Sequence, residues 1–175
     1  SCQLRNAAAV LALVDALQGK LPVPVEAIHQ GLAGPQLAGR FQIIPGRPTI
    51  IFDVAHNPQA VAGLAENLAQ MSAGEKTIAV VGMLADKDIQ GALAMLVGRV
   101  DVWLLADLDT PRGASAAQLS AALAGAGLGG RIDCFSSPLE AFTCAAKLAG
   151  ENDRILVFGS FYTVAAVMRA LKHGS

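Results

Sequence analysis

The sequence predicts an α/β domain of three layers, in which a mostly parallel sheet of about six strands, with one antiparallel edge strand, has helices on both faces. Apolar residues make up 53% of the 175 residues and charged residues only 15%, so the chain can bury a sizeable core. Short apolar runs alternate with Ala-rich runs, which is typical of parallel βαβ units. The first two apolar runs are joined by a connection too short for a parallel crossover, which indicates a hairpin.

The N-terminal residues lack this alternation and predict two helices. Asn6–Leu17 is rich in Ala and Leu at helical spacing, and Val25–Leu32 follows a break that contains Pro22 and Pro24. These look like the closing helices of a domain whose beginning is missing. We therefore expect residues 1–38 to be the closing helices or linker of a central domain outside this chain, and residues 39–175 to be the α/β domain.

Six strands and five helices are expected after this boundary. The predicted strands are Phe41–Ile44, Thr49–Asp53, Thr77–Val81, Val100–Ala106, Arg131–Phe135 and Arg154–Phe158. The predicted helices are Gln59–Gln70, Ile89–Gly98, Ala116–Leu123, Pro138–Leu148 and Thr163–Leu171. If Pro45–Pro48 is the whole hairpin loop, Ile44 pairs with Thr49 and Arg40 lies opposite Asp53.

Charge and composition exclude several classes of protein. The formal net charge is −1 and no basic stripe is present, so no nucleic-acid partner is expected. No apolar stretch reaches the roughly 20 residues that span a bilayer, and the N-terminus does not resemble an export signal, so no membrane partner is expected. Cys2, Cys134 and Cys144 have no metal-type spacing and are expected to be small apolar residues in a cytoplasmic protein, with Cys134 and Cys144 buried.

Polar residues follow four of the predicted strands. In open α/β sheets ligands bind at the carboxyl ends of the strands, so these segments are the candidate site. They are Asp53–Pro58, Gly82–Asp88, Asp107–Gly113 and Gly159–Thr163.

Each of these segments also has a purely structural interpretation. Asp53 and Asn57 could cap the next helix, with His56 an ordinary loop histidine. Asp86 or Asp88 could be a helix cap beside Lys87 as a surface charge, Arg112 could lie on the surface, and Ser160 could cap the last helix. Two apparent motifs are excluded: Gly125–Gly130 follows a helix instead of a strand, and Gly159-Ser160 lacks the second glycine of a nucleophile elbow.

The order of the segments is more specific than any one of them. The chain contains Gly39-Arg40-Phe41, then Asp53-Val54-Ala55-His56-Asn57-Pro58, then Gly82-Met83-Leu84-Ala85-Asp86-Lys87-Asp88, then Phe158-Gly159-Ser160-Phe161-Tyr162-Thr163. In this order they closely resemble the C-terminal domain of the folylpolyglutamate synthase and dihydrofolate synthase family, which belongs to the Mur ligase superfamily. The resemblance covers essentially the whole chain and implies a Rossmann-like domain.

The resemblance also implies a reaction and its participants. Enzymes of this family use ATP and Mg²⁺ to phosphorylate the carboxylate of a folate or dihydropteroate, and the amine of L-glutamate then attacks the acyl phosphate to form an amide. This places the chain in folate biosynthesis and one-carbon metabolism. Carried over from the family, Asn6, Arg40 and Asp53 would contact ATP, and His56, Asn57 and Ser160 would be catalytic. His56, Ser160, Lys87 and Asp88 would contact glutamate.

Parts of such an enzyme are missing from the sequence. It has no P-loop, no Mg²⁺-binding set and no pteroate-binding region, so the metal ligands are expected in the missing central domain and the fragment is expected to be inactive alone. Two alternatives stay open: a stand-alone α/β binding module, and a related cell-wall Mur-type amino-acid ligase domain. The segment Phe158–Phe161 makes the second less favoured.

Overall fold

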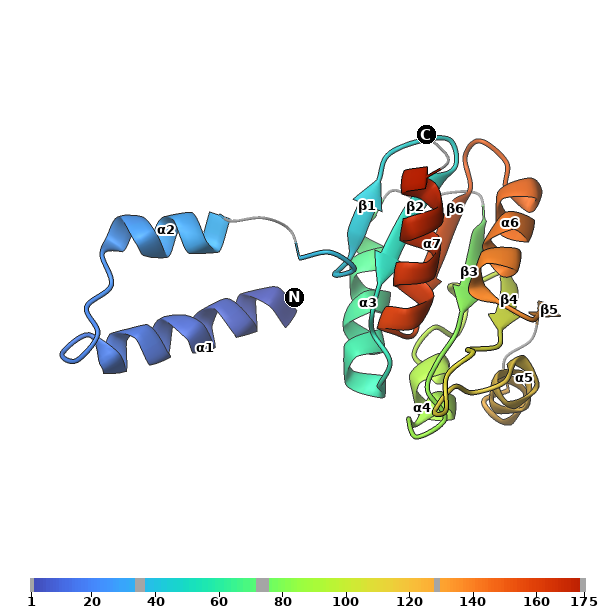
Figure 1. Cartoon of the computed structure of the whole chain (residues 1–175), viewed down its shortest axis with the longest axis horizontal. Helices are drawn as coiled ribbons and strands as arrows, with labels where there is room; N and C mark the ends of the chain where they lie inside the picture. Colours follow the sequence, from blue (N-terminus) through green and yellow to red (C-terminus); the bar gives the residue numbers. More distant parts are fainter. Residues whose placement is uncertain (1, 34–36, 72–75, 128–129, 174–175) are drawn as a thin grey trace. The chain divides into compact units, whose positions relative to one another are not determined.

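The computed structural model describes residues 2–33, 37–71, 76–127 and 130–173, and its contacts divide the chain into two compact units, Ser1–Leu37 and Ala38–Ser175. The N-terminal unit contains α1 (Cys2–Leu17) and α2 (Val25–Ala33), so both predicted helices are present (Figure 1). The side chain of Gln18 closes the turn between them, because its amide group bonds both the N–H and the carbonyl of Val23.

The larger unit is a six-stranded sheet with the order β1-β2-β6-β3-β4-β5, in which only the β1–β2 pair is antiparallel. The strands are β1 (Gln42–Ile44), β2 (Thr49–Asp53), β3 (Thr77–Val81), β4 (Val102–Ala106), β5 (Arg131–Phe135) and β6 (Arg154–Phe158). The helices are α3 (Pro58–Gln70), α4 (Ile89–Ala94), α5 (Ala116–Gly125), α6 (Pro138–Leu148) and α7 (Phe161–His173). The predicted fold class, with its single antiparallel edge strand, is confirmed.

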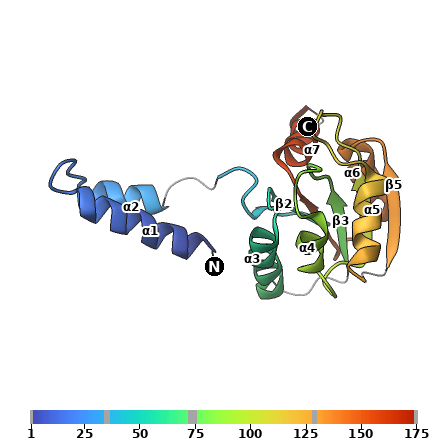
Figure 2. The ribbon, with the colours of Figure 1, turned by 90° about the horizontal axis from the view of Figure 1, so that it is seen from below.

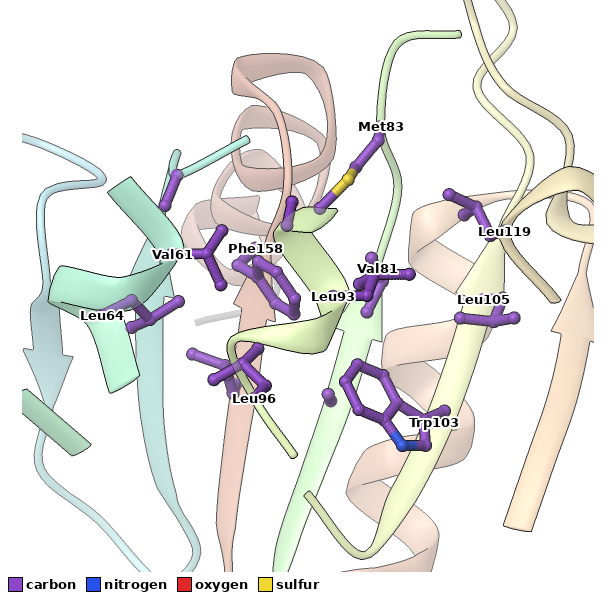
Figure 3. Packing of buried hydrophobic residues seen from close by; sticks show 14 of the residues in the cluster. Val61, Leu64, Val81, Met83, Leu93, Leu96, Trp103, Leu105, Leu119 and Phe158 are labelled. Atoms are coloured by element: carbon purple, nitrogen blue, oxygen red, sulfur yellow. The ribbon is translucent and has the colours of Figure 1, made fainter. Parts of the chain in front are cut away.

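Alternating residues of the central strands build two apolar layers. Ala79, Val81, Leu156 and Phe158 face α3, α4 and α5, and their immediate neighbours along the strands face α6 and α7. Figure 2 shows the two sets of helices on opposite sides of the sheet, and Figure 3 shows side chains of the first layer, among them Phe158, Leu93 and Trp103. Both faces of the central strands are buried, as in parallel sheets generally.

The last strand, β6, lies in the middle of the sheet between β2 and β3. The chain leaves β2 and β3 toward α3 and α4 on one face, whereas it leaves β6 toward α7 on the other. Neighbouring strands whose connections leave in opposite directions form a topological switch point, which is where ligands bind in open α/β sheets. The fold therefore has a topological switch point on each side of β6.

The hairpin register differs by one residue from the prediction. Ile44 pairs with Ile50 and Gln42 with Phe52, so continuing the register places Phe41, not Arg40, opposite Asp53. The predicted Arg40–Asp53 pairing is wrong. The connection between the paired residues Ile44 and Ile50 therefore takes in Thr49 as well as Pro45–Pro48.

Several element ends also differ from the prediction. Helix α4 ends at Ala94 because the following bonds run from residue i to i−3, as in Leu96 N–H to the Leu93 carbonyl, until Gly98 turns the chain with a φ of +68°. Helix α7 begins earlier than predicted, at Phe161. Cys134 was expected to be buried but is exposed, because it lies on the edge strand β5.

Candidate functional site

Three of the predicted segments begin side by side at one edge of the sheet. Phe158 pairs with Asp53 on one side and with Val81 on the other, so the last residues of β2, β6 and β3 are in register. The loops that carry the Asp53, Ser160 and Asp86 segments start from these three residues. The structure thus brings together, on both sides of β6, polar residues that are far apart in sequence.

Asp53 is a buried carboxylate with two backbone partners. One oxygen accepts the N–H of Ala55 at 2.8 Å and the other accepts the N–H of Phe41 at 2.9 Å. Burial raises the pKa of Asp53 above its usual value, and the two backbone hydrogen bonds and the positive charge of Arg40 oppose that rise. Asp53 therefore ties the segment before β1 to the start of the β2–α3 loop.

The segment that carries Arg40 has an unusual backbone. Gly39 and Phe41 both have positive φ, +73° and +44°, and the Gly39 carbonyl accepts the N–H of Val54 at 2.8 Å. Positive φ is strained for a residue with a side chain such as Phe41, and the hydrogen bond to Asp53 offsets that strain. The side chain of Arg40 is exposed and forms no ion pair with Asp53 in the part of the chain described here.

His56 and Asn57 lie in the loop between β2 and α3. The ring nitrogen Nδ1 of His56 lies 2.8 Å from the carbonyl oxygen of Val54. The side chain of Asn57 accepts the N–H of Ala60 at 2.9 Å and caps α3, with Pro58 in the first turn. The capping interpretation of Asn57 is confirmed, and His56 stands half-exposed just before the cap.

Ser160 belongs to a buried network that joins α7 to the β3 loop. Its hydroxyl lies 2.8 Å from the Thr163 hydroxyl and accepts the Thr163 N–H at 3.1 Å, and the Thr163 hydroxyl donates to the Gly82 carbonyl at 2.8 Å. Gly159 makes this approach possible: with a φ of +112°, a Cβ there would lie 2.6 Å from the Gly82 oxygen. Sequence reasoning missed Thr163, although serine three residues before threonine at a helix start is a capping signal.

The loops after β3 and β4 are joined by charges. Asp86 lies 2.8 Å from the Arg112 guanidinium and 3.1 Å from the Lys87 ammonium, and these two partners lower the pKa of Asp86. The Ala85 N–H donates to the Arg112 carbonyl, so the backbones meet as well. Asp88 caps α4 by accepting the Gly91 N–H at 2.9 Å.

Asn6 is the one predicted site residue outside the larger unit, and no metal ligands were predicted in this chain. Asn6 lies in α1, in the N-terminal unit, so its contact with ATP stays a prediction. In residues 2–33, 37–71, 76–127 and 130–173, no group of three or more His, Cys, Asp and Glu side chains is placed to hold a metal ion. None of the helices in those ranges is long and apolar enough to span a bilayer.

The arrangement suits positioning rather than covalent catalysis. Its buried hydroxyls, on Ser160 and Thr163, are bonded within the fold, and its carboxylates bond backbone N–H groups or cations. Arg40, His56 and Lys87 keep at least part of their side chains open to solvent at the carboxyl ends of the strands. Cationic and hydrogen-bonding groups in such a place can hold an anionic substrate.

Comparison with known proteins gives consistent matches. A family model described as Mur ligase, glutamate ligase domain, matches residues 39–161. The dihydrofolate synthase/folylpolyglutamate synthase of Escherichia coli K12 is 43% identical over 166 residues, which are 95% of this chain and 37% of that protein. The solved structure of E. coli FolC in complex with DHPP and ADP is 42% identical with a TM-score of 0.85, over 97% of this chain and 39% of the other.

A second solved structure adds two further ligands. It is a bifunctional folylpolyglutamate synthase/dihydrofolate synthase with Mn, AMPPNP and L-glutamate bound, 49% identical with a TM-score of 0.77, over 87% of this chain and 36% of the other. The present chain thus spans well under half the length of these relatives.

Proposed function

Since the chain belongs to the Mur ligase family of glutamate ligase domains, we propose that it works as that domain of an ATP-dependent ligase. The ligase joins L-glutamate to the carboxylate of a folate or dihydropteroate through an acyl phosphate. The observation that carries the proposal is the meeting of the Asp53–Pro58, Gly82–Asp88 and Gly159–Thr163 segments at the switch points beside β6. A relative solved with DHPP and ADP, and another with AMPPNP and L-glutamate, support the substrates.

The residues divide between the two small substrates. Arg40 offers a charged donor to a phosphate, and Asp53 offers a carboxylate to a ribose hydroxyl or a base, so we assign both to ATP together with Asn6. His56, Lys87 and Asp88 serve the glutamate side. Asn57 and Ser160 act through the helix starts and loop positions that their hydrogen bonds hold. This division stays a proposal until variants are measured.

Mg²⁺ is not assigned to any residue of this chain. Among the residues that the structure describes, no group of three or more His, Cys, Asp and Glu side chains is placed to hold the ion. We propose that its ligands, the triphosphate-binding loop and the pteroate site lie in preceding domains of the same protein, to which residues 1–38 also belong, and that the protein works in the cytoplasm.

The complete protein that carries this chain provides the test. Purified and supplied with ATP, Mg²⁺, L-glutamate and dihydropteroate or a folate, it should form an amide product one glutamate heavier, with ADP and phosphate released. The isolated chain is the control and should turn over no ATP. Failure of the complete protein to form any glutamate adduct with either acceptor would refute the proposal, and ADP formation without an adduct would point to another acceptor acid.

A further inference from the structure

The segment Asp107–Gly113 follows β4 at the same edge of the sheet as the candidate site, and the proposed function gives it no role. The structure nevertheless joins it to the loop after β3. The Ala85 N–H donates to the Arg112 carbonyl at 2.8 Å, and Leu84 and Gly113 form an antiparallel bridge. The two loops therefore run side by side as a short ladder beyond the ends of their strands.

This ladder fixes the backbone at Arg112. Next to it the Ala114 N–H donates to the Met83 carbonyl at 2.9 Å, and both of these residues are buried. The chain turns so tightly here that a Cβ at Gly113 would overlap the carbonyl oxygen of Leu108. The side chain of Arg112 therefore starts from a fixed point beside the loop after β3.

The carboxylate of Asp86 bridges two cations, one from each loop. Its oxygen Oδ2 lies 2.8 Å from the Arg112 guanidinium and 3.1 Å from the Lys87 ammonium. The Lys87 side chain is only 29% exposed, against 65% for Arg112, so its position is the more closely specified of the two. Two positive charges thus share one negative charge, and the cluster as a whole can attract an anion.

The two cations have different tasks in this cluster. A lysine ammonium ends a flexible four-carbon stem, and a neighbouring aspartate does not by itself fix its direction. Arg112, held by its own loop, supplies the second bond that fixes the Asp86 carboxylate. Because Asp86 divides its charge between two partners, the Lys87 ammonium is only partly neutralised and can still bind a carboxylate.

We propose that Arg112 is a positioning residue for the amino-acid substrate. Through Asp86 it holds the Lys87 ammonium where that group receives a carboxylate of the incoming glutamate, and Arg112 itself does not touch the substrate. This inference rests on the proposed function, which assigns Lys87 to the glutamate side and leaves Arg112 without a task.

Neither a different carboxylate nor a purely structural task accounts for the arrangement as well. Asp53 accepts backbone N–H groups and Asp88 caps α4, so in the described ranges only Asp86 is paired with Lys87. The ion pair of Asp86 with Arg112 is not needed to join the two loops, since backbone hydrogen bonds already do so. Exposed ion pairs also contribute little to stability.

The test compares Arg112→Gln with Arg131→Gln in the complete protein. Arg131 is the matched control, because it forms an equally short and similarly exposed ion pair with Asp133 on the edge strand β5. Arg112→Gln should raise the KM for glutamate about tenfold or more, with kcat, the KM for ATP and the Tm little changed. Arg131→Gln should match the unsubstituted protein. A parallel rise in the KM for ATP, or no rise in the KM for glutamate, would overturn the proposal.

A double-mutant cycle with Lys87→Met separates positioning from any other role. Methionine keeps an apolar stem but has no charge, so Lys87→Met should itself raise the KM for glutamate. If Arg112 acts through Lys87, adding Arg112→Gln should then raise that KM by less than about twofold. A further rise by the same factor as in the single variant would show that Arg112 acts independently of Lys87 and would refute the inference. Failure of the unsubstituted protein to add glutamate at all would instead refute the proposed function.

Discussion

Asp53 accepts two backbone N–H groups, whereas the exposed side chain of the neighbouring Arg40 donates no hydrogen bond within the described chain. Asp53→Ala leaves the N–H groups of Phe41 and Ala55 without their partner and should destabilise the domain by about 2 kcal/mol or more. Arg40→Ala removes an exposed side chain and should change stability by about 0.5 kcal/mol or less. Both should impair ATP use in the complete protein. Urea unfolding and ATP kinetics check the pair, and equal stability losses would contradict it.

The pKa of Asp53 adds a second argument about its role. Burial raises this pKa above the usual value of 3.8, so the folded domain holds the proton more tightly than the unfolded chain does. The stability that Asp53 contributes by this effect is complete below 3.8 and is lost as the pH rises through the folded value. Ionisation of Asp53 is therefore less favourable in the folded domain than in the unfolded chain.

Single residues were partly predictable for physical reasons. Helix capping was predictable because it depends only on a polar side chain next to the first turn of a helix. It was foreseen for Asn57, Asp88 and Ser160. The register that places Phe41, not Arg40, opposite Asp53 was not predictable, because the sequence does not show that the connection takes in Thr49 as well as Pro45–Pro48. The Asp86–Arg112 pair likewise joins two loops whose meeting only the strand order decides.

The turn between β6 and α7 approaches the loop after β3 so closely that a side chain at Gly159 should destabilise the domain. Gly159→Ala puts a Cβ 2.6 Å from the Gly82 carbonyl oxygen at a φ of +112°, so it should cost about 3 kcal/mol or more and lower ligase activity in the complete protein. Gly98→Ala is the matched control, since Gly98 also has positive φ but nothing within 4 Å of the added Cβ. It should cost about 1 kcal/mol. Thermal unfolding of both variants is the measurement, and similar losses would show that the contact with Gly82 is unimportant.

Element types were predictable and some of their ends were not. Short, mostly apolar runs bounded by turn residues predicted β2, β3, β5 and β6 with their observed bounds. Such runs are a local property of the sequence. Helix α4 was predicted too long because its composition stays helical through Val97 although its hydrogen bonds tighten after Ala94. The strand order has no local signal in the sequence and was not predicted.

For the whole molecule, the division into two units predicts independent folding of the larger one. Residues 38–175 contain both apolar layers and all six strands, so this segment alone should unfold in a single cooperative transition. Calorimetry should give equal calorimetric and van't Hoff enthalpies. Two separate transitions, or the absence of any without residues 1–37, would show that the N-terminal unit is required for the fold.

The position of β6 has a consequence for biosynthesis. While a ribosome is still making residues 49–135, strands β2 and β3 are available but the place between them is empty, because β6 comes later in the chain. The complete sheet can therefore form only after residue 158 has emerged, and both switch points beside β6 form with it. A product of premature termination before β6 would carry Asp53, His56 and Lys87 without the strand that brings their loops to one edge, so we expect the proposed site to form only when synthesis of the domain is nearly finished.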